Sequence, residues 1–156
     1  MYVDDCFVIG NKQAIKKALD DIEVHFDIKQ SEEISDFIGC TIERKDNRVL
    51  LSQPDLINKL IKTFESKISK MRLYETPATG GGRVQRPMTK EELISDEDQS
   101  EFRSRVGSLL YLLKHSRPDL SNSVHELTKV MDGANKAHQK MLCRVIKHVQ
   151  DTKNRN

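Results

Sequence analysis

The sequence has little aromatic content, few cysteines and no long apolar stretch. Tryptophan is absent and the aromatic share is only 5%, so the core has to be mostly aliphatic. The three cysteines, Cys6, Cys40 and Cys143, are an odd number without CxxC or Cys/His ligand spacing, which argues against a disulfide framework and against a zinc site. We therefore expect a reducing, intracellular setting, either cytoplasmic or nuclear.

Signals for targeting, membrane insertion and phosphate-loop binding are also missing. The N-terminus is acidic where a signal peptide needs a basic region, and no apolar run approaches the roughly 20 residues that span a bilayer. We expect a soluble protein with no membrane partner. Gly80, Gly81 and Gly82 are not followed by the Gly-Lys-Ser/Thr of a phosphate-binding loop, so they indicate flexibility instead.

The net charge of +2 is unevenly divided along the chain. Residues 1–50 carry 7 Lys or Arg against 11 Asp or Glu, residues 51–100 carry 8 of each, and residues 101–156 carry 11 against 5. An acidic beginning and a basic end suit a protein that holds metal ions in one place and a polyanion in another. The simpler interpretation, that both are solvated faces, stays open on charge alone.

The first 73 residues predict a lobe of mixed α and β structure. Residues 2–9 are rich in strand formers, and apolar side chains recur at helical spacing after Asn11, a potential N-cap. The segment "DFIGCTIER" is strand-like, "KDN" has turn residues and "RVLLS" is a second apolar run, which together predict a β-hairpin. Pro54 then lies in the first turn of a helix whose apolar face extends to Phe64.

From Tyr74 to Ser100 proline and glycine break the pattern, so we predict a flexible linker over residues 74–100. Within residues 101–152, apolar residues recur at helical spacing in three segments, which predicts three amphipathic helices packed in a small basic bundle. Their apolar stripes are Phe102, Val106, Leu109, Leu110 and Leu113; Leu120, Val124, Leu127 and Met131; and Ala137, Met141, Val145 and Val149.

The order of these pieces carries a resemblance. "YVDD" between apolar residues is followed by a helix, by "FIGCTIER" and "RVLLSQPDLINKLIKTF", by the broken stretch, and by "FRSRVGSLLYLLKHSRPDLSNSVHEL". In this order they resemble the later part of a copia-type retrotransposon reverse transcriptase, an RNA-directed DNA polymerase, over nearly the whole chain. The resemblance implies an α+β fold, with a partial polymerase palm at residues 1–73 and a thumb-like or connection-like helical lobe at residues 101–152.

The same resemblance implies a catalytic role for the adjacent carboxylates. Asp4 and Asp5 would lie at the tip of a hairpin, where Asp4 holds catalytic Mg²⁺ and Asp5 is the weaker or indirect ligand. Polymerases use two such ions roughly 3.5–4 Å apart to activate the primer hydroxyl and stabilise the transferring phosphate. The charge of the ion also makes two neighbouring carboxylates tolerable in an apolar setting. Tyr2 would pack beneath the incoming nucleotide.

Two further groups of residues take roles from the resemblance. Phe37, Ile38 and Gly39 resemble the primer-positioning hairpin of the family, although a strand with one glycine is also typical of a bulge or a tight contact. Basic residues of the helical lobe lie mostly between its apolar positions, where they could reach the phosphates of an RNA or DNA primer–template. The candidate nucleic-acid-binding residues are Arg103, Arg105, Lys140, Arg144 and Lys147.

The family takes a further metal-binding aspartate, the fingers and much of the nucleotide pocket from sequence that precedes the YVDD box. We therefore expect a polyprotein fragment that is inactive as a polymerase by itself. Copies could also associate through an unpaired edge of the opening hairpin. Two alternatives remain, a non-catalytic nucleic-acid-binding module and a domesticated interaction protein with no nucleic-acid role.

Overall fold

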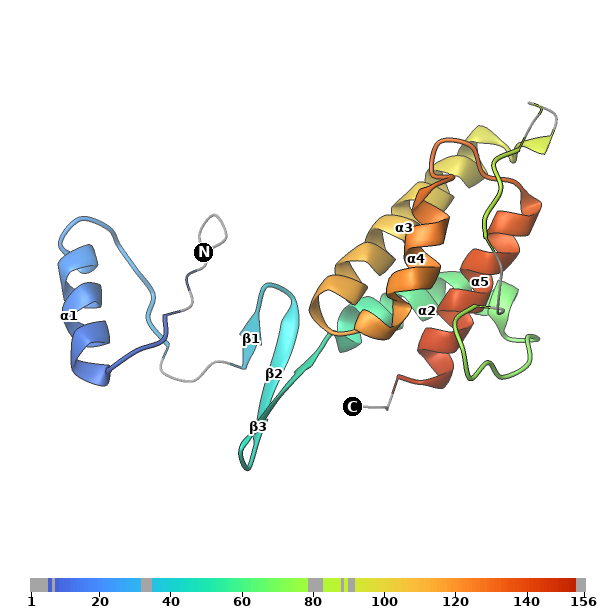
Figure 1. The fold of residues 1–156 in the computed structure, drawn as a ribbon. Coiled ribbons are helices and arrows are strands. Elements are labelled where there is room, and N and C mark those ends of the chain that lie inside the picture. The colour runs from blue at the N-terminus through green and yellow to red at the C-terminus, as the bar shows by residue number, and fades with distance from the viewer. Residues whose placement is uncertain are drawn as a thin grey trace. The chain divides into compact units, whose positions relative to one another are not determined.

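The computed structural model describes residues 6, 8–31, 35–78, 83–87, 89 and 92–153. The chain divides into two compact units, residues 1–50 and residues 51–156 (Figure 1). None of the helices formed by these described residues is long and apolar enough to cross a membrane.

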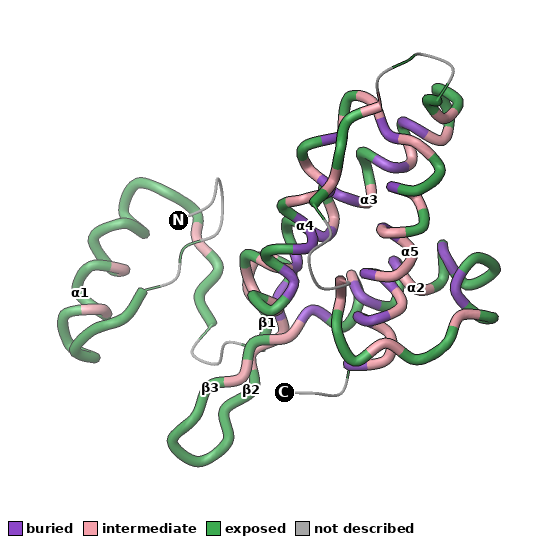
Figure 2. The backbone as a smooth tube through the Cα atoms, turned by 45° about the vertical axis from the view of Figure 1, so that its right-hand side comes forward, coloured by how far each residue is buried: buried purple, intermediate pink, exposed green. Residues whose placement is uncertain are grey.

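The first unit contains helix α1 (Lys12–Glu23). The side-chain oxygen of Asn11 accepts a 2.9 Å hydrogen bond from the backbone N–H of Gln13, which confirms the predicted N-cap. Ile15 and Leu19 on the apolar face are only half-buried, and no residue of α1 is buried. Figure 2 accordingly draws most of α1 in the colour of exposed residues. This helix is therefore amphipathic without a core of its own.

A small sheet follows in the order β1 (Asp36–Phe37), β2 (Cys40–Lys45) and β3 (Arg48–Ser52). Strands β1 and β2 are antiparallel, with Phe37 opposite Cys40. Asp46 and Asn47 form the two-residue turn before β3, and Asp46 has φ 53°, a left-handed conformation that aspartate tolerates. The predicted hairpin is confirmed. Helices and an antiparallel sheet together confirm the α+β class, while the assignment of a polymerase palm stays a prediction.

The second unit is helical, as the sequence predicted for its basic part. Pro54 occupies the first turn of α2, and the hydroxyl of Ser95 accepts a 3.2 Å hydrogen bond from the backbone N–H of Asp98 at the start of α3. The elements are α2 (Pro54–Ile68), α3 (Asp96–His115), the short 3-10 helix η2 (Pro118–Leu120), α4 (Ser121–Thr128) and α5 (Lys136–Asp151).

One apolar core joins helices α2, α3, α4 and α5, and Figure 2 shows buried residues along these helices. Helix α2 packs against α5 more extensively than any other pair of elements. The sequence grouped α2 with the first 73 residues, whereas the compact helical unit begins at residue 51. The core contains Ile57, Leu60, Phe64, Ile68, Phe102, Val106, Leu109, Leu112, Leu120, Val124, Leu127, Val130, Ala134, Leu142, Val145, Ile146 and Val149.

The buried face of α3 differs from the predicted stripe at its C-terminal end. Leu112 is fully buried, whereas Leu110 is 37% exposed and Leu113 is half-buried. The assignment of Leu110 to the core was therefore wrong. Helix α3 packs against η2 and α4 as well as against α2 and α5, and this packing leaves Leu112 buried and Leu110 partly exposed.

Described parts of the predicted linker are attached to the helices. The backbone N–H of Val84 donates to Glu126 of α4 at 3.0 Å, and Nε of Arg86 donates to the carbonyl oxygen of Lys129 at 3.0 Å. The backbone N–H of Ile94 donates to the carbonyl oxygen of Ala134 at 3.1 Å. Residues 83–87 and the segment just before α3 therefore lie along the bundle.

Candidate nucleic-acid interface

Two of the five predicted phosphate-binding residues present their charges to solvent. Arg103 lies on α3 and Lys140 on α5, and both are exposed. Neither makes an ion pair within 4.0 Å among the described residues. An exposed, unpaired cation can approach a phosphate without first breaking an internal contact, so these two positions suit backbone binding.

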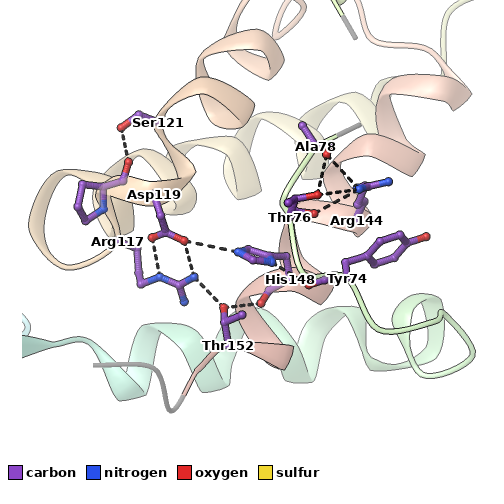
Figure 3. A network of polar contacts seen from close by, with 10 residues as sticks. Tyr74, Thr76, Ala78, Arg117, Asp119, Ser121, Arg144, His148 and Thr152 are labelled. Atoms are coloured by element: carbon purple, nitrogen blue, oxygen red, sulfur yellow. Dashed lines mark hydrogen bonds and ion pairs between the residues drawn. The ribbon is translucent and has the colours of Figure 1, made fainter. Parts of the chain in front are cut away.

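Arg144 is instead used inside the unit. Its Nη2 donates to the carbonyl oxygen of Ala78 at 3.0 Å and to both oxygens of Thr76 at 3.3 Å (Figure 3). The guanidinium carbon lies 4.4 Å from the ring centroid of Tyr74, a cation–π distance. Its Nε is buried with no hydrogen-bond partner in the described part of the chain. Arg144 therefore fastens residues 74–78 onto α5.

Lys147 and Arg105 are also partly withdrawn from solvent. The ammonium group of Lys147 pairs with Asp151 one helical turn away, and the side chain of Lys147 is only 13% exposed. The other carboxylate oxygen of Asp151 accepts a 3.1 Å hydrogen bond from the backbone N–H of Tyr74. Arg105 is half-buried, and its Nε has no partner among the described residues. Their roles in nucleic-acid binding stay predictions, and the structure gives Lys147 a different contact.

A second polar network connects the loop after α3 to the end of α5 (Figure 3). Arg117 donates from Nε and Nη2 to the two oxygens of Asp119, at 2.8 and 2.7 Å, and Nη2 also donates to the hydroxyl of Thr152 at 2.8 Å. The side chain of Arg117 is only 11% exposed, so its charge serves the protein interior. The bidentate pair makes the "SRPD" segment rigid, and the hydrogen bond to Thr152 fixes that segment to the end of α5.

His148 completes this network from α5. Its Nδ1 lies 2.9 Å from the carbonyl oxygen of Tyr74, and because a carbonyl only accepts, Nδ1 carries the hydrogen. The remaining nitrogen, Nε2, faces Oδ2 of Asp119 at 3.5 Å. The hydrogen bond from Arg117 lowers the pKa of Asp119 from its ordinary value of 3.8, His148 acts in the same direction, and partial burial opposes both.

The predicted primer-grip residues form a tight turn. Phe37 ends β1, Cys40 begins β2 opposite it, and Ile38 and Gly39 are the two residues between them. Both have positive φ, 49° for Ile38 and 66° for Gly39, as in the type I′ turns of two-residue hairpins. Glycine tolerates this conformation, but a β-branched isoleucine is strained there. The turn projects a half-buried apolar side chain from a fixed backbone.

Comparison with known proteins finds relatives of the chain among retrotransposon Pol polyproteins. The Retrovirus-related Pol polyprotein from transposon TNT 1-94 of Nicotiana tabacum is 27% identical to the chain over an alignment of 157 residues, gaps included, which covers 97% of the chain. The corresponding polyprotein from transposon RE1 of Arabidopsis thaliana is 30% identical over an alignment of 158 residues, which covers 99% of the chain. The chain is a homologue of retrotransposon Pol polyproteins.

The homologous polyproteins are much longer than the chain. The chain spans 12% of the TNT 1-94 polyprotein and 10% of the RE1 polyprotein. A putative transposon Ty5-1 protein of Saccharomyces cerevisiae is 25% identical over 155 residues, and the chain spans 48% of it. No protein-family model matches the chain, and no solved structure gives a significant match.

The predicted catalytic residues Asp4 and Asp5 and the predicted nucleotide-pocket residue Tyr2 lie outside the described residues, so their roles stay predictions. Within the described part of the chain no group of three or more His, Cys, Asp or Glu side chains is placed to hold a metal ion.

The sequence did not identify the residues that hold the network of Arg117, Asp119 and His148 together. Arg117 and Asp119 belong to the "RPD" motif that carries the resemblance, but the motif indicates no contact for either side chain. The contact of Asp119 with His148 joins residues 29 positions apart, and no local pattern indicates it. The network has a structural role, because each of its described polar contacts is to another part of the same unit.

Proposed function

We propose that the chain is the later part of the reverse transcriptase region of a copia-type retrotransposon polyprotein, and that its helical unit contacts the backbone of an RNA or DNA primer–template. The observation that carries this proposal is the order of the motifs, from "YVDD" to "SRPDL", in a chain whose matches to Pol polyproteins cover 97% and 99% of its length. The similarity to Pol polyproteins supports the assignment to a retrotransposon polyprotein. The order of the motifs supports the assignment to its reverse transcriptase region.

Arg103 and Lys140 are the residues best suited to this contact. Both are exposed, and each lies on a helix fixed by the common core. Phosphate contacts of this type position a protein on a duplex without reading its sequence. We therefore expect binding that depends on salt and tolerates changes of base sequence.

Asp4 and Asp5 suit Mg²⁺ by their chemistry, because this ion prefers carboxylate oxygen and is commonly held by one or two carboxylates together with substrate phosphates. When bound, the ion would activate the primer hydroxyl and stabilise charge on the transferring phosphate. The two residues would supply only part of its octahedral shell. A polypeptide of these 156 residues, taken alone, is therefore expected not to extend a primer.

The binding proposal is tested by titrating a fluorescein-labelled RNA–DNA primer–template with the full chain at salt concentrations from about 50 to 200 mM. Over this range the slope of log affinity against log salt concentration should be measurable. Log affinity should fall linearly with log salt, and a scrambled duplex of the same length should bind equally. Binding that is absent at low salt, or that does not change with salt, would contradict the proposal.

The proposed inactivity of the chain alone and the proposed role of Asp4 are tested by primer extension. Primer extension with Mg²⁺ or Mn²⁺ should be undetectable for the chain alone and should appear when an upstream segment of a homologous polyprotein is joined to it. Asp4→Asn should then abolish the restored extension. Extension by the chain alone would contradict the proposed inactivity, and restored extension that survives Asp4→Asn would contradict the assigned metal ligand.

A further inference from the structure

A groove in the helical unit has an apolar floor and an uncompensated cationic side. It has a volume of about 460 Å³ and lies between α2, α3 and α5. Phe64, Phe102 and Leu142 form its floor and are 1–2% exposed, while Met71 and Cys143 are half-buried beside them. This volume is within the range of ligand pockets, roughly 300–1,000 Å³, and a mostly apolar lining is typical of such sites.

The charges on the α2 and α3 side of the groove are already balanced. Lys67 of α2 pairs with Glu101 of α3 at 2.9 Å, and its ammonium nitrogen lies 5.0 Å from the ring centroid of Phe64. Asp98 lies in the first turn of α3, where a carboxylate compensates the positive end of the helix dipole. A ligand gains little from adding a negative charge on this side.

The α5 side is different. Lys136 and Lys140 line the groove, lie one helical turn apart and are exposed. No described acidic side chain lies within ion-pair distance of either, and the first turn of α5 contains no acidic residue. Two like charges at this spacing repel each other, and Lys136, the first residue of α5, also stands at the positive end of the helix dipole. A carboxylate placed here would relieve both effects.

We propose that this groove docks a short acidic peptide segment of a partner protein, with an aromatic or large aliphatic residue on the apolar floor and flanking carboxylates at Lys136 and Lys140. The charge complementarity is local, because Asp98 and Glu101 line the same groove and repel any negative charge placed on the α3 side. A peptide with one anchor and a few carboxylates satisfies the α5 side without crowding the α3 side. This inference does not rest on the proposed polymerase identity, but it shares Lys140 with the proposed primer–template contact, so the peptide and the nucleic acid would compete for that lysine.

Cys143 provides a reporter inside the groove. Cys143 is half-buried, Cys40 is buried and Cys6 is exposed. In a Cys6→Ser variant, Cys143 is therefore more accessible to a labelling reagent than Cys40, the other remaining cysteine. Burial raises the pKa of the Cys143 thiol, so labelling is best followed at mildly alkaline pH, with mass spectrometry to separate Cys143 from Cys40. A bound anchor residue should shield this sulfur.

The experiment measures the labelling rate of Cys143 in the Cys6→Ser full chain with three acetylated, amidated peptides. Asp-Asp-Phe-Asp-Asp should slow labelling at least fivefold at saturation. Asp-Asp-Ala-Asp-Asp, which lacks the anchor, and Asn-Asn-Phe-Asn-Asn, which lacks the charges, should each bind at least several-fold more weakly. Lys136→Glu should weaken the first peptide roughly threefold to tenfold.

Lys62→Glu is the matched control, because it makes the same charge change at an exposed lysine of α2 that does not line the groove. Its effect should stay below twofold. The proposal is overturned if Asp-Asp-Phe-Asp-Asp gives no protection at millimolar concentration, or if the alanine peptide protects equally. It is also overturned if Lys136→Glu and Lys62→Glu act alike, or if a pentanucleotide of thymidine protects Cys143 better than the peptide, which would assign the groove to nucleic acid.

Discussion

Nδ1 of His148 lies 2.9 Å from the carbonyl oxygen of Tyr74, 74 positions earlier in the sequence. The backbone N–H of the same Tyr74 donates to Asp151, one turn further along α5. Both backbone polar groups of Tyr74 are therefore satisfied by side chains of one helix. This arrangement holds the segment after α2 against α5 and explains why part of the predicted linker is fixed.

Replacing His148 tests this attachment. His148 is 4% exposed, so loss of its donor would leave the carbonyl oxygen of Tyr74 without this partner in a mostly buried site. We expect His148→Leu to lower the free energy of unfolding by about 1–3 kcal/mol. His148→Asn can place an amide N–H near the position of Nδ1 and should lose less. Urea unfolding followed by helical circular dichroism measures both, and equal losses for the two variants would argue against the hydrogen bond.

Much of the fold could be predicted because its signals are local. Asn11 before an amphipathic run, Pro54 in a first turn and "KDN" between apolar runs each act within a few residues of themselves. The end of the buried stripe on α3 could not be predicted in this way. Whether Leu110 or Leu112 faces the core depends on where η2 and α4 pack, which is a tertiary property.

The candidate interface was harder to predict for the same reason. Arg144 appears in the sequence as one more cation on a basic helix, but its charge is occupied by groups 66 and 68 positions away. Arg103 has no such partner among the described residues and remains exposed. Sequence spacing alone can locate cations on a helix face, but it cannot say which of them another segment will cover.

We predict that the buried His138 lowers the free energy of unfolding of the protein in mild acid. Its Nδ1 accepts a 3.1 Å hydrogen bond from the backbone N–H of Asn135, whose side chain in turn accepts from the backbone N–H of His138, a reciprocal capping box. Burial lowers the pKa of His138 from its ordinary value of 6.5. The unfolded chain therefore takes up the proton first, so this stability is complete above pH 6.5 and declines as the pH falls below it.

The measurement is the urea midpoint of the wild-type chain and of His138→Gln between pH 7.5 and 5. Glutamine keeps a capping acceptor at this position and does not titrate, so the variant should lose less stability across this window than the wild type. The contribution of Asp119 does not confuse the result. Its pKa is lowered from 3.8, so its stabilisation is lost only as the pH falls below that value. Parallel curves for the two proteins would contradict the assignment to His138.

Arg103 and Arg144 should respond differently to the same substitution. Arg103→Ala removes an exposed cation, so it should weaken primer–template binding and reduce the slope of log affinity against log salt by about 1, with little change in stability. Arg144→Ala removes three hydrogen bonds and a contact with the ring of Tyr74, so it should cost about 1–3 kcal/mol of unfolding free energy. Its salt slope should stay near that of the wild type.

Fluorescence anisotropy at several salt concentrations and urea unfolding on the same preparations separate these effects. Lys140→Ala serves as the second exposed position and should behave like Arg103→Ala. If Arg144→Ala lowers the salt slope while leaving stability unchanged, then Arg144 contacts phosphate in solution and the internal role assigned to it is wrong.

The strained turn between β1 and β2 gives the last prediction. Ile38 has φ 49°, a conformation that costs a β-branched residue about 1–2 kcal/mol and that asparagine adopts more readily. Ile38→Asn should therefore stabilise the hairpin, although losing the contacts of a half-buried isoleucine offsets part of the gain. We expect a net gain of roughly 0.5–1 kcal/mol, seen as twofold to fivefold slower hydrogen exchange at the amide of Ile42. That amide donates to the carbonyl oxygen of Ser35 at 2.7 Å and reports pairing next to the turn.

Asp46→Asn is the matched control, since Asp46 also has positive φ but already tolerates it, and the exchange rate at the amide of Ile42 should change little. Unchanged or faster exchange at Ile42 in Ile38→Asn would mean that contacts of the isoleucine side chain, and not backbone strain, decide the stability of this turn.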